Sequence, residues 1–95
     1  EEAAKKFMTP AIAPILGKLI TRFEALPVFS KQTGEEAFKQ LVEEEGMKMG
    51  QLAQPVRVAL TGRTASPGLF DVMEVLGRDR TLFRLRQGVE RASHA

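Results

Sequence analysis

The 95-residue sequence contains no cysteine, only one histidine and no long uninterrupted apolar run. Without cysteine, the chain has no disulfides and no thiolate metal sites. His94 lies beside the last residue, where chains commonly fray, so a catalytic site built on histidine is not expected. No apolar stretch approaches the roughly 18 residues that a membrane helix needs. The charged start EEAAKKF also lacks the apolar centre of a signal peptide.

Other catalytic arrangements are missing as well. Ser30, Ser66 and Ser93 have no plausible base, and no glycine pattern of a phosphate-binding loop occurs. The acidic run 43–45 is interpreted as a solvated helix face, because neighbouring residues on a helix point in different directions and so make a poor metal site. An independent small enzyme is therefore disfavoured, and binding is the better functional class.

Apolar residues recur at helical spacing along the chain, and no strand-like alternation competes with them. Residues 1–95 are long enough for one small domain with a modest core. We expect a single all-α domain of five or six short helices, arranged like a helical bundle. The chain begins without methionine, in what reads as the middle of a helix. We therefore expect a fragment of a longer protein, with residues 93–95 as a frayed tail.

Prolines divide the first third of the sequence into helices. Residues 1–8 read as one helix that ends before Pro10. The next helix has two candidate starts, with either Pro10 or Pro14 in its first turn. Pro27 ends this second helix.

The middle of the chain contains one cap signal and one ambiguity. Thr33 followed by Glu36 has the form of a capping box, which predicts that Thr33 is the N-cap of a third helix. Pro55 then lies inside an apolar series, so a helix either begins near it or is kinked by it. We favour a short turn over residues 47–50, followed by a helix over about residues 53–61.

Two further helices are predicted beyond Gly62. Ser66 is the expected N-cap of the first, with Pro67 at its first position and Gly77 as its stop. The last helix runs from Arg78 to about residue 92. Its expected inner stripe consists of Leu82, Leu85 and Val89, with Phe83 as an optional member.

The charge is distributed unevenly. Residues 1–46 carry a net −2, whereas residues 47–95 carry +4, and seven of the eight cations in the second half are arginine. The planar guanidinium suits phosphates and base edges better than the point charge of lysine does. Arg80, Arg84 and Arg91 recur at helical intervals, which predicts that they line one outer face of the last helix.

Several short motifs share the order and spacing of a known family. They are residues 47–50 (MKMG), 54–62 (QPVRVALTG), 66–70 (SPGLF) and 75–77 (VLG), with Arg84-Leu85 eight residues after Leu76. Together they resemble the C-terminal anticodon-binding domain of bacterial-type glutamyl-tRNA synthetases, which are class I aminoacyl-tRNA synthetases. The resemblance covers about residues 46–89, and residues 1–45 share only the helical pattern.

This resemblance implies a domain that grips the anticodon loop of glutamate tRNA. Catalysis with ATP and Mg²⁺ would lie in upstream domains, so no cofactor is expected here. It further implies a cytoplasmic, monomeric protein that contacts the other domains of its own chain and no membrane. The family's base-contacting positions fall on Arg57, Ser66, Pro67, Gly68 and Leu69, where serine replaces the commoner threonine and keeps its hydroxyl. Arg80 and Arg84 are the further expected RNA contacts.

A second function stays open from the sequence. The arginine face could equally meet an acidic partner protein, which would make the chain a helical protein-interaction module. The residues also leave open whether the parent enzyme charges glutamine tRNA in addition. The reader of the third anticodon base belongs, by the same resemblance, to the preceding domain.

Overall fold

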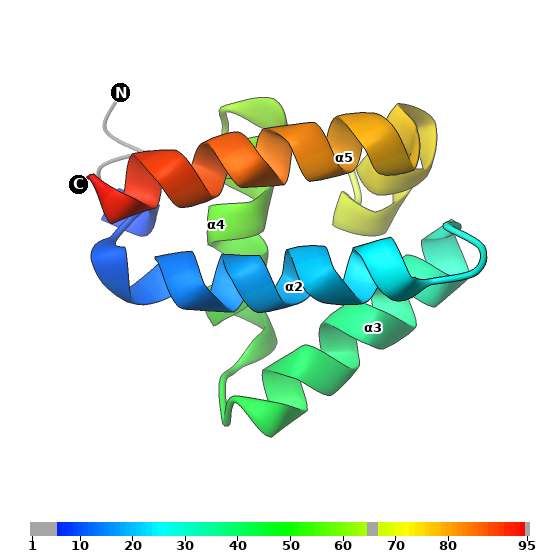
Figure 1. The fold of residues 1–95 in the computed structure, drawn as a ribbon, viewed down its shortest axis with the longest axis horizontal. Helices are drawn as coiled ribbons and strands as arrows, with labels where there is room; N and C mark the ends of the chain where they lie inside the picture. The colour runs from blue at the N-terminus through cyan, green and yellow to red at the C-terminus, as the bar shows by residue number, and fades with distance from the viewer. Residues whose placement is uncertain (1–5, 65–66, 95) are drawn as a thin grey trace.

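The computed structural model describes residues 6–64 and 67–94, and within these ranges it contains helices and no strand. In chain order they are the 3-10 helix η1 (Pro10–Ile12) and the α-helices α2 (Ala13–Ala25), α3 (Lys31–Glu44), α4 (Met49–Thr61) and α5 (Leu69–Ser93). Helix α2 and the C-terminal part of α5 lie side by side, and α4 crosses behind both (Figure 1). The predicted all-α domain is confirmed.

Both predicted start signals of the second helix are used. Pro10 opens η1, and Pro14 lies in the first turn of α2, which follows without a break. Helix α2 ends at Ala25 because Leu26, which precedes Pro27, has an extended backbone (φ −66°, ψ 127°). Of the helix expected over residues 1–8, the described part is helical at Lys6 and Phe7.

The capping box of α3 lies one turn earlier than the sequence suggested. Ser30, not Thr33, is the N-cap, and its Oγ accepts a hydrogen bond from the Thr33 N–H at 3.2 Å. The Thr33 hydroxyl oxygen accepts from the Ser30 N–H at 2.9 Å, which completes the reciprocal pair. Thr33 thus occupies the third helical position of the capping box, where glutamate or glutamine is usual. Because the usual residue type is absent, the box at Ser30 is not recognisable from the sequence.

Helix α4 begins before the predicted position and contains Pro55 in its interior. The Gln51 Oε1 accepts from the N–H of Lys48, the N-cap, at 2.8 Å, so the helix begins at Met49. Pro55 cannot donate to the Gln51 carbonyl, and the helix continues with that one bond missing. The predicted start near residue 53 was therefore wrong, because the early cap and the burial of Pro55 outweigh the lost hydrogen bond.

Gly77 divides α5 into two segments, in agreement with the prediction that one helix ends at this glycine and another begins after it. Its backbone (φ 80°, ψ 172°) is non-helical and lies where residues with a Cβ are strained. The second segment continues to Ser93, and the His94 N–H donates to the Glu90 carbonyl at 3.2 Å. Helical structure therefore reaches into the 93–95 segment that was expected to fray, and Ala95 lies outside the described residues.

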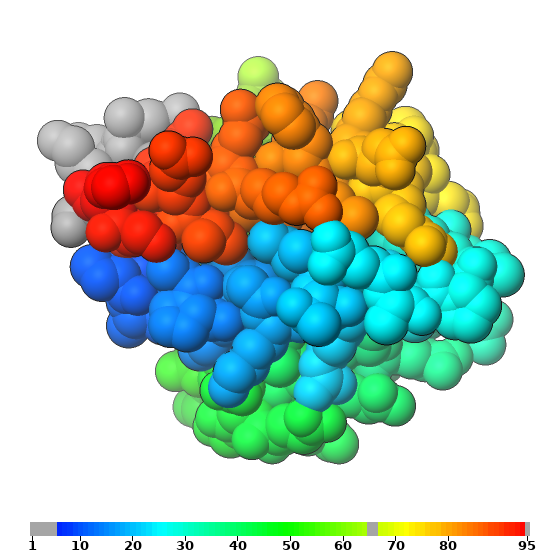
Figure 2. All heavy atoms as spheres, in the orientation of Figure 1, coloured from blue at the N-terminus to red at the C-terminus, as the bar shows by residue number. Residues whose placement is uncertain are grey.

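The core lies where α2, α4 and α5 meet. Gly88 allows this contact, since a Cβ at this position would lie 3.0 Å from the Ala59 Cβ on α4. Side chains of α2 and of the second α5 segment meet along their length in the space-filling view (Figure 2). Fully buried side chains come from every described α-helix and include Leu16, Phe23, Phe38, Leu41, Leu52, Val56, Leu60, Met73 and Leu85.

The last helix has the predicted phase with one exception. Leu82 and Leu85 are buried, and Val89 packs against the core. Phe83 does not join them, because its side chain is 59% exposed on the opposite side of the helix. None of the helices over residues 6–64 and 67–94 is long and apolar enough to cross a bilayer.

We expect Leu85→Ala to lower the free energy of unfolding by about 2–5 kcal/mol, because a fully buried side chain would leave a cavity. Urea unfolding followed by circular dichroism measures the change. Gln87→Ala, two residues later on the exposed side, is the control and should change stability by no more than about 0.5 kcal/mol. Similar losses in both variants would show that the assigned helix phase is wrong.

Candidate nucleic-acid interface

The end of α4 is shaped by Thr61 and Gly62. Gly62 adopts a left-handed backbone (φ 75°), and its N–H donates to the Val58 carbonyl at 2.8 Å, which closes the helix. The Thr61 hydroxyl donates to the Arg57 carbonyl at 2.8 Å, and its oxygen accepts the Arg63 N–H at 3.1 Å. The half-buried Arg57 lies one turn before the end of α4. The hydrogen bonds of Thr61 and Gly62 hold the backbone that follows it in one conformation.

The start of α5 differs from the prediction. Gly68 is the N-cap and Leu69 the first helical residue, so Pro67 lies outside the helix, where it is exposed. Ser66, the predicted cap, lies outside the described residues. The Leu69 side chain is only 5% exposed and packs in the core, so it offers no apolar surface to a base. What Leu69 does present is a first-turn N–H group, which has no partner within the helix.

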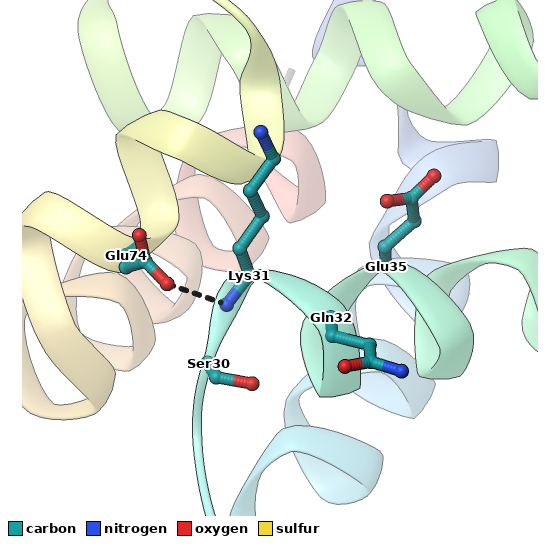
Figure 3. A pocket seen from close by; sticks show the side chains of 5 residues that line it. All are labelled: Ser30, Lys31, Gln32, Glu35 and Glu74. Carbon is teal, nitrogen blue, oxygen red and sulfur yellow. Dashed lines mark hydrogen bonds between the residues drawn. The ribbon is translucent and has the colours of Figure 1, made fainter.

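Contacts with α3 hold the first segment of α5 in place. The Lys31 Nζ lies 2.7 Å from the Asp71 Oδ1, and the Lys31 N–H donates to the Glu74 Oε2 at 3.1 Å (Figure 3). Glu74 thereby places negative charge at the N-terminus of α3, where the helix dipole favours it. The hydrogen bond from Lys31 to Asp71 raises the pKa of the Lys31 ammonium above its ordinary value. Phe38 packs edge-on against Phe70, with ring centroids 5.4 Å apart.

The backbone of Gly68 lies close to the Asp71 carboxylate. A Cβ built at Gly68 would lie 2.7 Å from the Asp71 Oδ2, closer than such atoms approach. Any residue with a side chain at the N-cap must therefore displace the Asp71 carboxylate, which also binds Lys31. The backbone of Gly68 (φ −47°, ψ 134°) is accessible to other residues, and the Asp71 carboxylate is the end of a flexible, half-exposed side chain, so a side chain here would cost mainly the contacts of that carboxylate.

Arg84 does not lie free on the outer face as predicted. It is partly buried, and its Nη1 donates to the Leu60 carbonyl at 2.5 Å. Leu60 belongs to the last turn of α4, whose carbonyl groups have no partner within the helix. Arg84 therefore ties α5 to the end of α4. We use the name α4–α5 junction for Arg57, Thr61, Gly62, Pro67, Gly68 and the first turn of α5.

The other arginines of the second α5 segment also divide into two groups. Arg78 donates to the Leu26 carbonyl at 2.6 Å, and Arg86 pairs with Glu24 at 2.6 Å. Arg80 and Arg91 are exposed and form no ion pair with a residue in the described ranges. The predicted arginine face is thus reduced to these two side chains, since Arg84 serves the fold.

The acidic run at the end of α3 has structural partners. Glu45 pairs with Lys18 at 2.7 Å, and Glu44 pairs with Arg22, so both carboxylates connect α3 to α2. Among residues 6–64 and 67–94, no group of three or more histidine, aspartate or glutamate side chains could hold a metal ion.

The arginine and the helix N-terminus of the α4–α5 junction are groups of the kind that bind RNA, and comparison with known proteins identifies the family of the domain. A family model described as "Anticodon binding domain" matches residues 1–89. The chain therefore belongs to the anticodon-binding domain family, and the resemblance found in the sequence is confirmed.

Relatives of this chain include glutamate–tRNA ligases. Those of Geotalea uraniireducens and Geobacter sulfurreducens are 45% and 48% identical to it over 89 residues, which make up 94% of this chain. The chain spans 19% of the length of each of these two relatives. The crystal structure of a glutamate tRNA ligase from Elizabethkingia meningosepticum, in complex with its amino acid, superimposes with a TM-score of 0.87. That protein is 30% identical, and the match covers 95% of this chain and 18% of the other.

We expect Arg84→Ala to destabilise the domain, in contrast to the prediction from sequence alone. Loss of the guanidinium leaves the partly buried Leu60 carbonyl without its donor, which should cost about 1 kcal/mol. Thermal unfolding by circular dichroism measures this, with Arg80→Ala as the exposed control from the same helix. Equal melting temperatures for Arg84→Ala and the unmodified chain would show that the bond to Leu60 contributes nothing.

We further expect Gly68→Ala to displace the Asp71 carboxylate and so to lower the free energy of unfolding slightly by weakening its ion pair with Lys31. The loss should shrink when Asp71→Ala is also present, because the obstructing carboxylate is then gone, and the coupling should be about 0.5 kcal/mol or more. Urea unfolding of both single variants and the double variant gives this coupling. Gly50→Ala, in the first turn of α4 with open space around it, is the control and should not destabilise. Strictly additive effects of Gly68→Ala and Asp71→Ala would refute the contact.

Proposed function

We propose that this domain binds the anticodon loop of a tRNA at the α4–α5 junction, and that the tRNA is the glutamate acceptor. The observation that carries the proposal is the junction itself. In a chain of the anticodon-binding family, Arg57 near the end of α4 and the N-terminus of α5 are joined by one short connection. We assign the charging reaction, with ATP and Mg²⁺, to other domains of a longer cytoplasmic protein.

The chemistry of the junction suits unpaired bases. Anticodon bases are unstacked and expose their Watson–Crick edges, where most sequence-specific RNA recognition takes place. The Arg57 guanidinium can donate two hydrogen bonds to a carbonyl-bearing edge. The N–H groups of Leu69 and Phe70 can donate to uridine or cytidine oxygens, and the exposed ring of Pro67 offers a flat surface to a base.

The surroundings of the junction support binding by reducing its entropic cost. Thr61 and Gly62 fix the exit from α4, and Arg84 fixes the position of that exit relative to α5. Lys31 and Asp71 fix the start of α5 against α3. Donors that are already oriented lose less freedom when an RNA loop arrives, so more of the contact energy contributes to affinity.

The alternative of a protein-interaction module is weaker on the same evidence. It requires a continuous arginine face, yet Arg78, Arg84 and Arg86 each bind an acceptor within the domain. Arg80 is exposed, and we assign it a phosphate contact, which positions the RNA without reading its sequence.

We expect Arg57→Ala to weaken binding of a stem-loop with the glutamate anticodon by about 1–3 kcal/mol, the usual scale for a side-chain contact to a base. The loss should be smaller for a stem-loop with a mismatched anticodon, because only a base contact carries sequence information. Arg57→Lys should restore little, since lysine lacks the planar fork. Fluorescence anisotropy of labelled stem-loops at one salt concentration measures all of these affinities.

Arg80→Ala is the matched control and should weaken binding of both stem-loops alike. Circular dichroism confirms that each variant is folded before its affinity is measured. Equal losses for the two RNAs in Arg57→Ala would reduce Arg57 to a phosphate contact. Absence of binding by the unmodified chain would contradict the proposed function.

A further inference from the structure

Phe83 is the exposed aromatic residue of the second α5 segment. Its side chain is 59% exposed, although Leu82 and Leu85 on the same helix are buried. Three large apolar side chains besides Phe83 are exposed in the described residues, and none of them carries an aromatic ring. Phe83 thus presents a flat π surface to the solvent without a packing role that would explain it.

The helix segment that carries Phe83 has a net positive charge, and some of its arginines bind no acceptor within the described residues. Residues 78–93 carry five arginines against two carboxylates, those of Asp79 and Glu90. Three of the arginines bind acceptors within the domain, which leaves Arg80 and Arg91 exposed. Arg80 precedes Phe83 by three residues, so the two side chains are neighbours on the helix surface.

Arg91 projects from nearly the same side of the helix as Arg80. Eleven residues separate them, which is close to three turns and corresponds to about 16 Å along the axis. Phe83 lies between them in the sequence, about one turn after Arg80. The outer face of the segment therefore has an aromatic ring with an exposed guanidinium on either side along the helix. Asp79, four residues before Phe83, and Glu90, seven residues after it, place two carboxylates on the same surface, and the segment as a whole stays positively charged.

This face belongs to the same helix segment that contacts the end of α4. Arg84 follows Phe83 directly, and its guanidinium reaches the Leu60 carbonyl at the end of α4. The segment that carries Phe83 therefore packs against the end of α4, where the proposed function places the RNA.

We propose that Phe83 stacks on an unpaired nucleotide of the RNA, adjoining the anticodon bases, while Arg80 binds its phosphate. This inference rests on the proposed function and adds a contact outside the junction. A basic surface with an aromatic ring is the usual platform for single-stranded nucleic acid, because every base has a π face and every nucleotide a phosphate. An acidic protein partner would use the arginines but would have no need of the ring.

The composition of the chain permits a direct optical test. The sequence contains neither tryptophan nor tyrosine, so F83W introduces the sole indole and the sole strong fluorophore. Titration with the anticodon stem-loop should quench the F83W emission as a base stacks on the indole. V75W is the matched control, because Val75 is 85% exposed on the other segment of α5 and should report no stacking. A fully paired RNA duplex of two complementary strands should quench neither variant.

Affinity provides the second readout, by anisotropy of labelled stem-loop. F83A and F83L should each weaken binding about five-fold or more, since leucine keeps the apolar character and lacks the π face, whereas F83W should retain affinity. V75A should bind as the unmodified chain does. Because Phe83 is largely exposed, these variants should unfold at the temperature of the unmodified chain.

The outcomes separate the two proposals. RNA binding that depends on Arg57, together with unquenched F83W and unchanged affinity in F83A, would overturn the stacking contact and leave the anticodon proposal standing. No binding of stem-loop by the unmodified chain would overturn both. A blue shift of F83W emission that grows with protein concentration, without RNA, would assign this surface to contact between copies of the chain and overturn the inference.

Discussion

The close crossing of α4 and α5 at Gly88 is the constraint on which the rest of the structure depends. With no side chain at this position, the Ala59 methyl group packs at a distance that a Cβ on α5 would make too short. The two helices then lie near enough for Arg84 to reach the last turn of α4. As a result, the end of α4 is held against the second segment of α5, while contacts with α3 hold the first segment.

Arginine has two different duties in the second α5 segment. Arg78 and Arg84 donate to backbone carbonyls of Leu26 and Leu60, which would otherwise lack a donor near the ends of their helices. Arg80 stays exposed and is left for a ligand. A guanidinium can serve either purpose because it carries five donors and its charge does not depend on pH. The sign and number of charges on a helix therefore do not reveal how many are available for binding.

Local signals in the sequence were accurate where backbone conformation alone decides the outcome. Proline ended α2 at the expected place, and Gly77 broke α5 because its positive φ favours glycine. The N-cap positions were predicted less accurately. Several residues near Ser30 can act as the N-cap of α3, and the hydrogen bonds between these neighbours decide which one does. Pro55 was misjudged because a buried proline is retained when packing stabilises the helix by more than the missing bond costs.

By itself the sequence determined the helical class, the places where most helices end and, through its motifs, the family, because these depend on residues a few positions apart. Only the tertiary structure decided which side chains are available. It buried Leu69 in the core and turned Phe83 outward, and it placed Arg84 against a carbonyl 24 residues away in the sequence. Those outcomes depend on the positions of whole helices relative to one another, and the spacing of residues within one helix contains no information about them.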